Sequence, residues 1–348
     1  ADVVVCSCIG AGGEQLAAAS EQCEETGAAA GLTFSTVLID EATQATEPAS
    51  LVPLTRGCEQ LILVGDQNQL PPTILSRGAA AGGLATSLFA RLMLAGVAPV
   101  VLARQYRMHP RIAAFPGARF YGGRLASAPR AVDRPTPRGF PWPNAAVPVA
   151  FVAVRDDSDG ARGLEARGSG GATAEDGGGG ATSWCNAREA AAACAVVRAL
   201  LRGGGGGGDV APQDVGVITP YAAQVRRGGG RKRTAAPPRA PQPWELIEVR
   251  SVDGYQGREK EVIVLSAVRS NRCGAVGFLS DWRRLNVAIT RARRGVVIVG
   301  DPATLSHDAH WRAYIAWCAE NGALMTERDL RRALQQQQQP GGSGDAQQ

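Results

Sequence analysis

The stretch TVLIDEA, Thr36–Ala42, decides the fold class of this chain, because an apolar run there ends in two adjacent carboxylates. Uninterrupted apolar runs are typical of parallel strands that are covered on both faces. In a doubly wound sheet the carboxyl ends of the strands face the ligand crevice. Asp40 could there hold Mg²⁺ bound to nucleotide phosphates, and Glu41 could deprotonate an attacking water. A strand followed by a solvated acidic turn explains the pair equally well, so the dipeptide alone does not decide.

Further apolar runs recur along the chain with helical stretches between them, which favours an α/β fold with parallel sheets. The expected strands after the first are 61–64, 97–102, 147–154, 215–218, 262–265 and 296–299. The expected helices are 86–94, 186–202, 283–293 and 310–321. We place a domain break near residue 98, which gives a first domain at 1–97 and a second at 98–330.

Low-complexity composition interrupts this pattern at 155–183, 203–208 and 226–243, and again in the tail 331–348. Segments rich in Gly, Pro and polar residues bury too little apolar area to order themselves. The formal net charge of +5 is compatible with a polyanion partner but does not require one. The eight cysteines show no CxxC spacing and only three His are present, so no zinc framework is visible. No apolar run reaches membrane-spanning length.

A second site-like strand end follows about 25 residues after the first, in LILVGDQNQLPP, 61–72. The amide of Gln69 can donate to a phosphate oxygen and accept from a water, which suits a sensor of the nucleotide. An ordinary strand and loop is the alternative. Two such strand ends in succession make that alternative weaker.

Three later motifs complete the pattern. In RQYRMHP, 104–110, a guanidinium near a domain junction can reach a phosphate, whereas His109 is expected to pack or cap. In SVDGYQGREKE, 251–261, two glycines around an aromatic suit a loop that packs against backbone or phosphate. In RRLNVAITRARR, 283–294, a buried stripe at helical spacing ends at Arg291, where a finger-type cation is useful. A basic helix with a solvated face remains the interpretation for Arg283, Arg293 and Arg294.

Taken in this order, the motifs resemble those of superfamily-one helicases, and most closely the up-frameshift RNA helicases of nonsense-mediated mRNA decay. The resemblance covers residues 1 to about 130 and 184 to about 320. It implies two RecA-like domains, an ATP-driven 5′ to 3′ helicase activity, and the cofactors ATP and Mg²⁺. It also implies a single-stranded RNA substrate, decay-factor partners and a cytoplasmic location, with the nucleus as a second location.

The resemblance also implies roles for individual residues. Asp40 binds Mg²⁺, Glu41 is the catalytic base and Gln69 senses the γ-phosphate. The second domain lends two arginine fingers and lines the nucleotide: Arg107, Arg291, Gly257 and Glu259, the last near the ribose. The expected nucleic-acid contacts are Ser7, Gly10, Gly12, Thr219, Pro220, Tyr221, Ser251 and Val252, mainly through the strand's backbone.

The chain departs from the family in its phosphate loop, because no GxxxxGK[ST] string occurs in residues 1–348. We therefore expect the first domain to be truncated at its N-terminus and this chain alone to be inactive. The family's zinc-bearing Cys/His domain is also missing from these residues. Two alternatives stay open: a related nuclear helicase acting on DNA or RNA–DNA hybrids, and a non-catalytic nucleic-acid-binding fragment.

Overall fold

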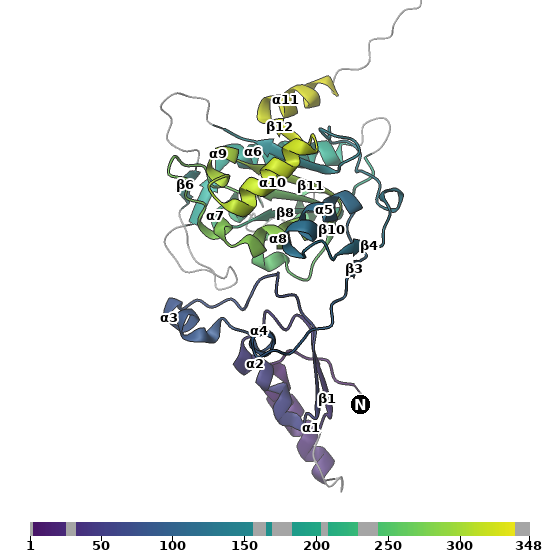
Figure 1. Ribbon diagram of the computed structural model, residues 1–348, viewed down its shortest axis with the longest axis vertical. Coiled ribbons are helices and arrows are strands. Elements are labelled where there is room, and N and C mark those ends of the chain that lie inside the picture. The colour runs from purple at the N-terminus through teal and green to yellow at the C-terminus, as the bar shows by residue number, and fades with distance from the viewer. Residues whose placement is uncertain are drawn as a thin grey trace, which may run out of the picture. The chain divides into compact units, whose positions relative to one another are not determined.

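The computed structural model describes residues 3–25, 33–155, 165–168, 183–202, 208–228 and 243–337. They form two compact units, unit 1 at Ala1–Val101 and unit 2 at Leu102–Gln348, which Figure 1 colours from purple to yellow along the chain. The division falls close to the break expected near residue 98. Each unit is described by itself.

Unit 1 is built on two parallel strands, β1 (Thr36–Ile39) and β2 (Gln60–Leu63), paired in register from Thr36 with Gln60 to Ile39 with Leu63. Its helices are α1 (Glu14–Glu25), α2 (Glu47–Leu51), α3 (Arg77–Ala79) and α4 (Leu88–Leu94). Along β1 the side chains alternate, with Val37 and Ile39 buried and Leu38 exposed. The expectation that both faces of this strand are covered is therefore wrong for unit 1.

Unit 2 holds a six-stranded parallel sheet in the order β12-β5-β11-β10-β8-β9. Its strands are β5 (Val149–Ala153), β8 (Val215–Thr219), β9 (Glu248–Ser251), β10 (Lys260–Ser266), β11 (Ala292–Gly300) and β12 (Leu324–Thr326). Two small pairs accompany it: β3 (Arg104–Gln105) with β4 (Ala126–Ser127), and β6 (Glu165–Gly168) with β7 (Ser183–Asn186). The α/β fold with a parallel sheet, expected from the apolar runs, is confirmed.

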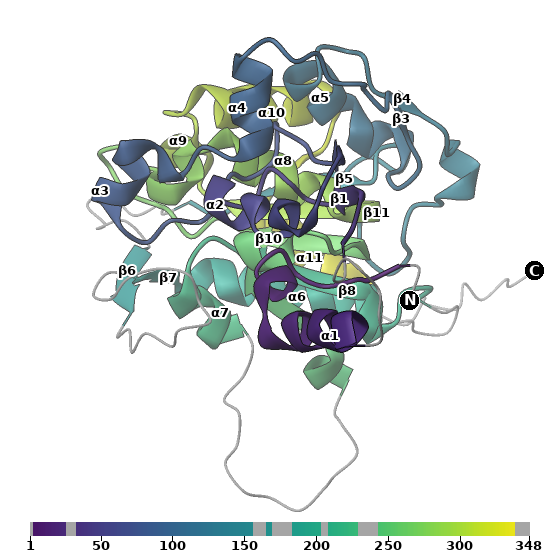
Figure 2. The ribbon, with the colours of Figure 1, turned by 90° about the horizontal axis from the view of Figure 1, so that it is seen from below.

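Helices cover both faces of this sheet, as Figure 2 shows with α6 on one side and α10 on the other. The helices of unit 2 are α5 (Pro110–Phe120), α6 (Ala187–Leu201), α7 (Ala222–Gly228), α8 (Trp282–Thr290), α9 (Pro302–Leu305), α10 (Ala309–Glu320) and α11 (Glu327–Gln336). Val262 and Val264 of β10 pack in one core cluster with Val196 and Leu200 of α6. Ile263, which lies between these two valines on the strand, is equally buried, as expected for a sheet that is covered on both faces.

One expected strand and one expected helix differ from the structure, as do two of the expected low-complexity segments. The run 97–102 is not a strand. The helix expected to reach residue 293 ends at Thr290, since β11 begins at Ala292.

Within 155–183, the residues 165–168 form β6 against β7. Helix α11 runs through 331–336, the first part of the expected tail. Residues 156–164, 169–182, 203–207, 229–242 and 338–348 lie outside the described part of the chain, so the expectations for them stand as predictions.

Candidate functional site

The carboxyl edge of the unit 1 sheet gathers the two strand ends singled out in the sequence. Asp40 and Glu41 follow β1, and Asp66 follows β2 by three residues, so the parallel pairing puts both loops at one edge. The N–H of Ala42 donates to the carbonyl of Val64 at 2.8 Å, which ties the first loop to the second strand. The acidic pair and the second loop, both singled out in the sequence, thus lie at the same edge, and their roles stay predictions.

Glu41 is held in an unusual backbone conformation, with φ at 50°, where a non-glycine residue is uncommon. Its N–H donates to Oδ1 of Asp40 at 2.9 Å, and its Oε2 accepts from the amide of Gln44 at 2.7 Å. Backbone strain of this kind persists only where the surroundings fix it, and it is concentrated at functional sites. The backbone conformation and the bond from Gln44 therefore restrict the orientation of the Glu41 carboxylate.

Gln69 lies in the loop after β2 and donates from its amide to Oδ2 of Asp66 at 2.9 Å. Oδ1 of the same aspartate accepts from the N–H of Asn68 at 2.9 Å, which shapes a tight turn. An amide held at a strand end in this way is suited to respond to a nearby phosphate, since it can exchange one acceptor for another.

The donor set at this edge fits nucleotide-bound Mg²⁺ rather than a cage built of protein alone. Among the residues that the structure describes, no group of three or more His, Cys, Asp or Glu side chains could hold a metal ion. Mg²⁺ in nucleotide sites takes one or two carboxylates and completes its shell with phosphates and waters. Asp40, exposed at the strand end, offers one such carboxylate.

The loop of Ser7, Gly10 and Gly12 is exposed at all three predicted contact residues. The N–H of Gly10 donates to Oγ of Ser7 at 3.0 Å, and the short helix η1 (Gly10–Gly12) buries Ala11. Arg56 donates from Nε to the carbonyl of Ala11 at 3.2 Å. The loop is thus held in place at Ala11 and exposed at Ser7, Gly10 and Gly12, which suits contact with the backbone of a nucleic-acid strand.

The amino edge of the unit 2 sheet brings together the four residues expected to line the nucleotide. Gly257 and Glu259 precede β10, Arg291 precedes β11, and Arg107 reaches them from the loop after β3. Arg107 forms an ion pair with Glu259 and donates from Nη1 to the carbonyl of Thr290 at 3.0 Å. Arg107 and Glu259 lie 152 residues apart in the sequence. The fold of unit 2 brings them to the same edge of the sheet.

Glu259 is the charge centre of this edge. Burial opposes its ionisation, but the hydrogen bond and charge of Arg107, with Arg293 and Arg291 nearby, hold the pKa of Glu259 below its ordinary value. Arg293 also pairs with Glu261 at 3.3 Å. Arg293 therefore takes part in a charge network, whereas the sequence favoured a solvated face for it.

Arg291 is buried at the end of α8 and donates from Nε to the carbonyl of Val287 at 3.1 Å. Its Nη2 donates to Oγ1 of Thr290 at 3.2 Å. The sequence correctly set Arg291 at the helix end but did not anticipate that the guanidinium folds back on its own helix. To reach a ligand, the side chain must exchange these two acceptors.

The carboxyl edge of the same sheet holds the residues expected to contact nucleic acid. Thr219 ends β8, with Pro220 and Tyr221 after it, and Ser251 ends β9, with Val252 after it. The side chains of three of them, Thr219, Tyr221 and Val252, are buried, so a contact there would run through the backbone. The buried hydroxyl of Thr219 has no hydrogen-bond partner among the described residues.

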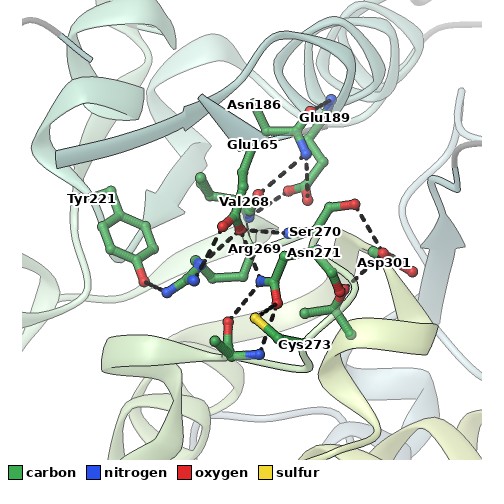
Figure 3. Close-up of polar contacts among 12 residues, drawn as sticks. Glu165, Asn186, Glu189, Tyr221, Val268, Arg269, Ser270, Asn271, Cys273 and Asp301 are labelled. Atoms are coloured by element: carbon green, nitrogen blue, oxygen red, sulfur yellow. Dashed lines mark hydrogen bonds and ion pairs between the residues drawn. The ribbon is translucent and has the colours of Figure 1, made fainter. Parts of the chain in front are cut away.

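A buried polar network, shown in Figure 3, frames this carboxyl edge and was missed in the sequence. Arg269 donates from Nε and Nη2 to the two oxygens of Glu165, at 2.8 and 3.1 Å, and from Nη1 to the hydroxyl of Tyr221 at 3.3 Å. The N–H of Ser270 and the amide of Asn271 add to the same carboxylate, at 2.8 and 3.2 Å. Four donors therefore converge on Glu165.

Glu189 of α6 is the second buried carboxylate of the network, and burial raises its pKa to about 8. It accepts from the N–H of Val268 at 2.7 Å and from the hydroxyl of Ser266 at 2.8 Å. Val268 has a φ of 71°, so the chain bends sharply as it leaves β10. Glu189 thereby fixes the bend that carries Arg269.

The two predicted groups of residues thus lie at opposite edges of the unit 2 sheet. β10 has seven residues between Glu259 at one end and the bend at the other. At about 3.3 Å per residue the strand keeps the edges roughly 20 Å apart. No helix in the described part of the chain is long and apolar enough to cross a membrane.

Comparison with known proteins bears on this arrangement. Two family models, each described as AAA domain, match residues 1–77 and 84–303. The chain is 39% identical to the regulator of nonsense transcripts 1 homolog of Arabidopsis thaliana, over 98% of this chain and 24% of that protein. It is also 39% identical to the ATP-dependent helicase NAM7 of Saccharomyces cerevisiae, over 93% of this chain and 30% of that protein.

The ATP-dependent helicase upf1 of Schizosaccharomyces pombe is 35% identical, over 93% of this chain and 31% of its own length. The chain thus spans between a quarter and a third of these curated relatives. Among solved structures, an arterivirus helicase in complex with DNA matches 78% of this chain and 41% of its own, with 15% identity and a TM-score of 0.36. The sequence matches confirm the resemblance to the up-frameshift helicases.

Proposed function

Because this chain belongs to the AAA domain family, whose models match residues 1–77 and 84–303, we propose that it is part of an ATP-dependent RNA helicase of nonsense-mediated mRNA decay. One observation carries the proposal. Within unit 2, the residues assigned to the nucleotide lie at the amino edge of the sheet, and those assigned to the nucleic-acid strand lie at its carboxyl edge. Both groups of unit 2 residues are thus carried by one sheet, which allows a change at the nucleotide to alter the contacts with the strand.

In this proposal Glu41 takes a proton from the attacking water, and its strained backbone and the bond from Gln44 keep its carboxylate in place. Asp40 holds the Mg²⁺, which supplies charge neutralisation to the phosphates when bound. Gln69 changes acceptor from Asp66 to a phosphate oxygen. Arg107 and Arg291 are the fingers, and each must leave the acceptors it has in this structure.

The substrate in this proposal is single-stranded RNA, bound through its backbone at the loops of unit 1 and unit 2. The proposal includes decay-factor partners, which the relatives' name, regulator of nonsense transcripts, supports, and a role in the cytoplasm. The composition supports a polyanion partner through its mild basic excess.

The test is the variant Glu41→Gln in the full-length protein. Loss of a general base lowers turnover by roughly two to four orders of magnitude, while ATP binding should persist. ATP turnover in the presence of single-stranded RNA and a nucleotide-binding titration measure the two quantities. Glu47→Gln is the matched control, because Glu47 is a carboxylate of unit 1 that pairs with Arg91 at the surface.

Turnover of Glu41→Gln at the level of Glu47→Gln would refute the assignment of the base. The 348-residue chain assayed alone is a second check, because it has no GxxxxGK[ST] loop to cradle the phosphates. We expect it to release no more phosphate than its own Glu41→Gln variant. Release above that level would mean that another element replaces the loop.

A further inference from the structure

A groove of about 320 Å³ opens at the carboxyl edge of unit 2, beside the loop of Thr219, Pro220 and Tyr221. That volume is at the lower end of the range for small-molecule sites. Three aromatic rings and two guanidinium groups dominate its walls: Trp184, Tyr221, Phe278, Arg269 and Arg284. Flat rings and flat cations are the groups on which a nucleobase stacks.

Phe278 is the unusual residue of this groove. Its side chain is 56% exposed, while the next residue, Leu279, is buried. The short helix η9 (Gly277–Ser280) turns one side chain into the core and therefore the other outward. The guanidinium of Arg284 lies over the ring at 5.4 Å from its centre, and the ring of Tyr221 tilts against it at 5.8 Å. The phenyl ring is thus held in one orientation although it is open to water.

The charges of the walls decide which part of a nucleotide the groove suits. Arg269 is paired with Glu165, and it lies 4.9 Å from the centre of the Trp184 ring. Arg284 pairs with Asp253 at 3.3 Å and with Asp281, itself a wall of the groove, at 3.8 Å. Both cations already have carboxylates against them, so a phosphate gains little there. Their planar faces remain suited to an aromatic ring.

We propose that this groove receives one base of a single strand, stacked on Phe278 and flanked by Arg284. The proposal rests on the proposed function, since it extends the strand contact at the loop of Thr219, Pro220 and Tyr221 by one base. Stacking is tolerant of sequence because every base has a π face. A contact of this kind therefore suits a helicase that moves along RNA of any sequence.

The experiment uses Phe278→Ala in the full-length protein and measures affinity for single-stranded RNA by fluorescence anisotropy. We expect the dissociation constant to rise roughly five- to 150-fold, which corresponds to 1–3 kcal/mol for one stacked base. The exposed position of Phe278 makes a folding defect a small risk. Phe278→Tyr keeps the ring and should keep the affinity.

Tyr106→Ala is the matched control. Tyr106 is also an exposed aromatic of unit 2, at 67%, but it lies in the loop after β3 with the amino-edge residues. It should leave strand affinity unchanged. A loss of strand affinity as large as that of Phe278→Ala would indicate a general loss of stability rather than a base contact, and would overturn the proposal.

A series of strands with one abasic site at each position in turn separates a base contact from a backbone contact. In the wild-type protein, an abasic site at one position should raise the dissociation constant about as much as Phe278→Ala does. Combining that strand with the Phe278→Ala variant should raise the dissociation constant no further. Additive losses at every position would overturn the proposal in favour of a backbone or protein contact. If the wild-type protein binds no single strand at all, the proposed function itself fails, which is a separate outcome.

Discussion

Each edge of the unit 2 sheet carries an Arg–Glu ion pair, and the two pairs differ in how much water they meet. At the amino edge, the side chains of Arg107 and Glu259 are 31% and 43% exposed. At the carboxyl edge, those of Arg269 and Glu165 are both 8% exposed. The first pair can separate at little cost, because exposed pairs contribute about 0–1 kcal/mol. The second cannot, since removing one partner of a buried pair leaves an uncompensated charge.

This difference teaches what each edge is built to do. At the amino edge, Arg107 is held in an exposed ion pair that a phosphate could replace, whereas Arg291 is buried and bonded to its own helix. At the carboxyl edge, Arg269 is held by Glu165, by the hydroxyl of Tyr221 and by the ring of Trp184. One edge therefore carries an exchangeable ion pair and the other a buried ion pair beside a groove.

The largest expected effect tests the amino edge. Arg291→Ala in the full-length protein should lower kcat for ATP by about a thousandfold, because an arginine finger acts on the charge of the transition state. Strand affinity should barely change, since Arg291 lies at the edge opposite to the groove. Steady-state ATP turnover and RNA anisotropy measure the two quantities on one preparation.

Arg283→Ala is the control for that experiment, because Arg283 lies at the other end of α8 and pairs with Asp281 at the surface. It should leave kcat near the wild-type value. The opposite result for Arg291→Ala, weaker strand binding with turnover kept, would make Arg291 a backbone contact and would remove the distinction between the edges.

The sequence could predict the amino edge because its chemistry lies in contiguous motifs. The apolar runs located β8, β10 and β11. The resemblance to the up-frameshift helicases implied roles at the nucleotide for Arg107, Glu259 and Arg291, and these roles stay predictions. The conformation of Arg291 could not be predicted, because it depends on which carbonyls its own helix leaves open at Val287 and Thr290. The run 97–102 misled for a related reason: apolar composition indicates a strand but not whether a neighbouring strand is available to pair with it.

The carboxyl edge could not be predicted, because its groove combines short pieces from distant segments. Trp184, Arg269 and Phe278 come from β7, the bend after β10 and η9. Glu165, the partner of Arg269, lies in a Gly-rich segment whose composition indicates no order. An exposed phenylalanine in the string GFLS cannot be told from a buried one by its residue type. The nearest signal in the sequence was a glycine followed by an aromatic residue in each of two loops: Gly254-Tyr255 before β10 and Gly277-Phe278 before α8.

A second comparison of the edges concerns stability. Glu165→Gln should lower the free energy of unfolding by about 3–5 kcal/mol, because it leaves the buried guanidinium of Arg269 without its charge partner. Glu259→Gln should lower it by about 1 kcal/mol or less, since both partners there meet water. Chemical denaturation without nucleotide or RNA, followed by near-ultraviolet circular dichroism, measures both variants. Equal losses would show that the exposed fractions do not distinguish the pairs.

The smallest effect compares two glycines with left-handed backbone, one at each edge. Gly257 has a φ of 71°, and a methyl group added to it would meet no heavy atom within 4 Å. Gly257→Ala should therefore lose only the conformational preference, about 1 kcal/mol. Gly277 has a φ of 58°, but its added methyl group would lie 2.7 Å from the hydroxyl of Tyr221, besides meeting Arg269. Gly277→Ala should cost about 2–4 kcal/mol, because overpacking adds to the strain. Thermal denaturation of the two variants side by side gives the difference, and a larger loss for Gly257→Ala would mean that the amino edge, not the groove, is the rigid part of unit 2.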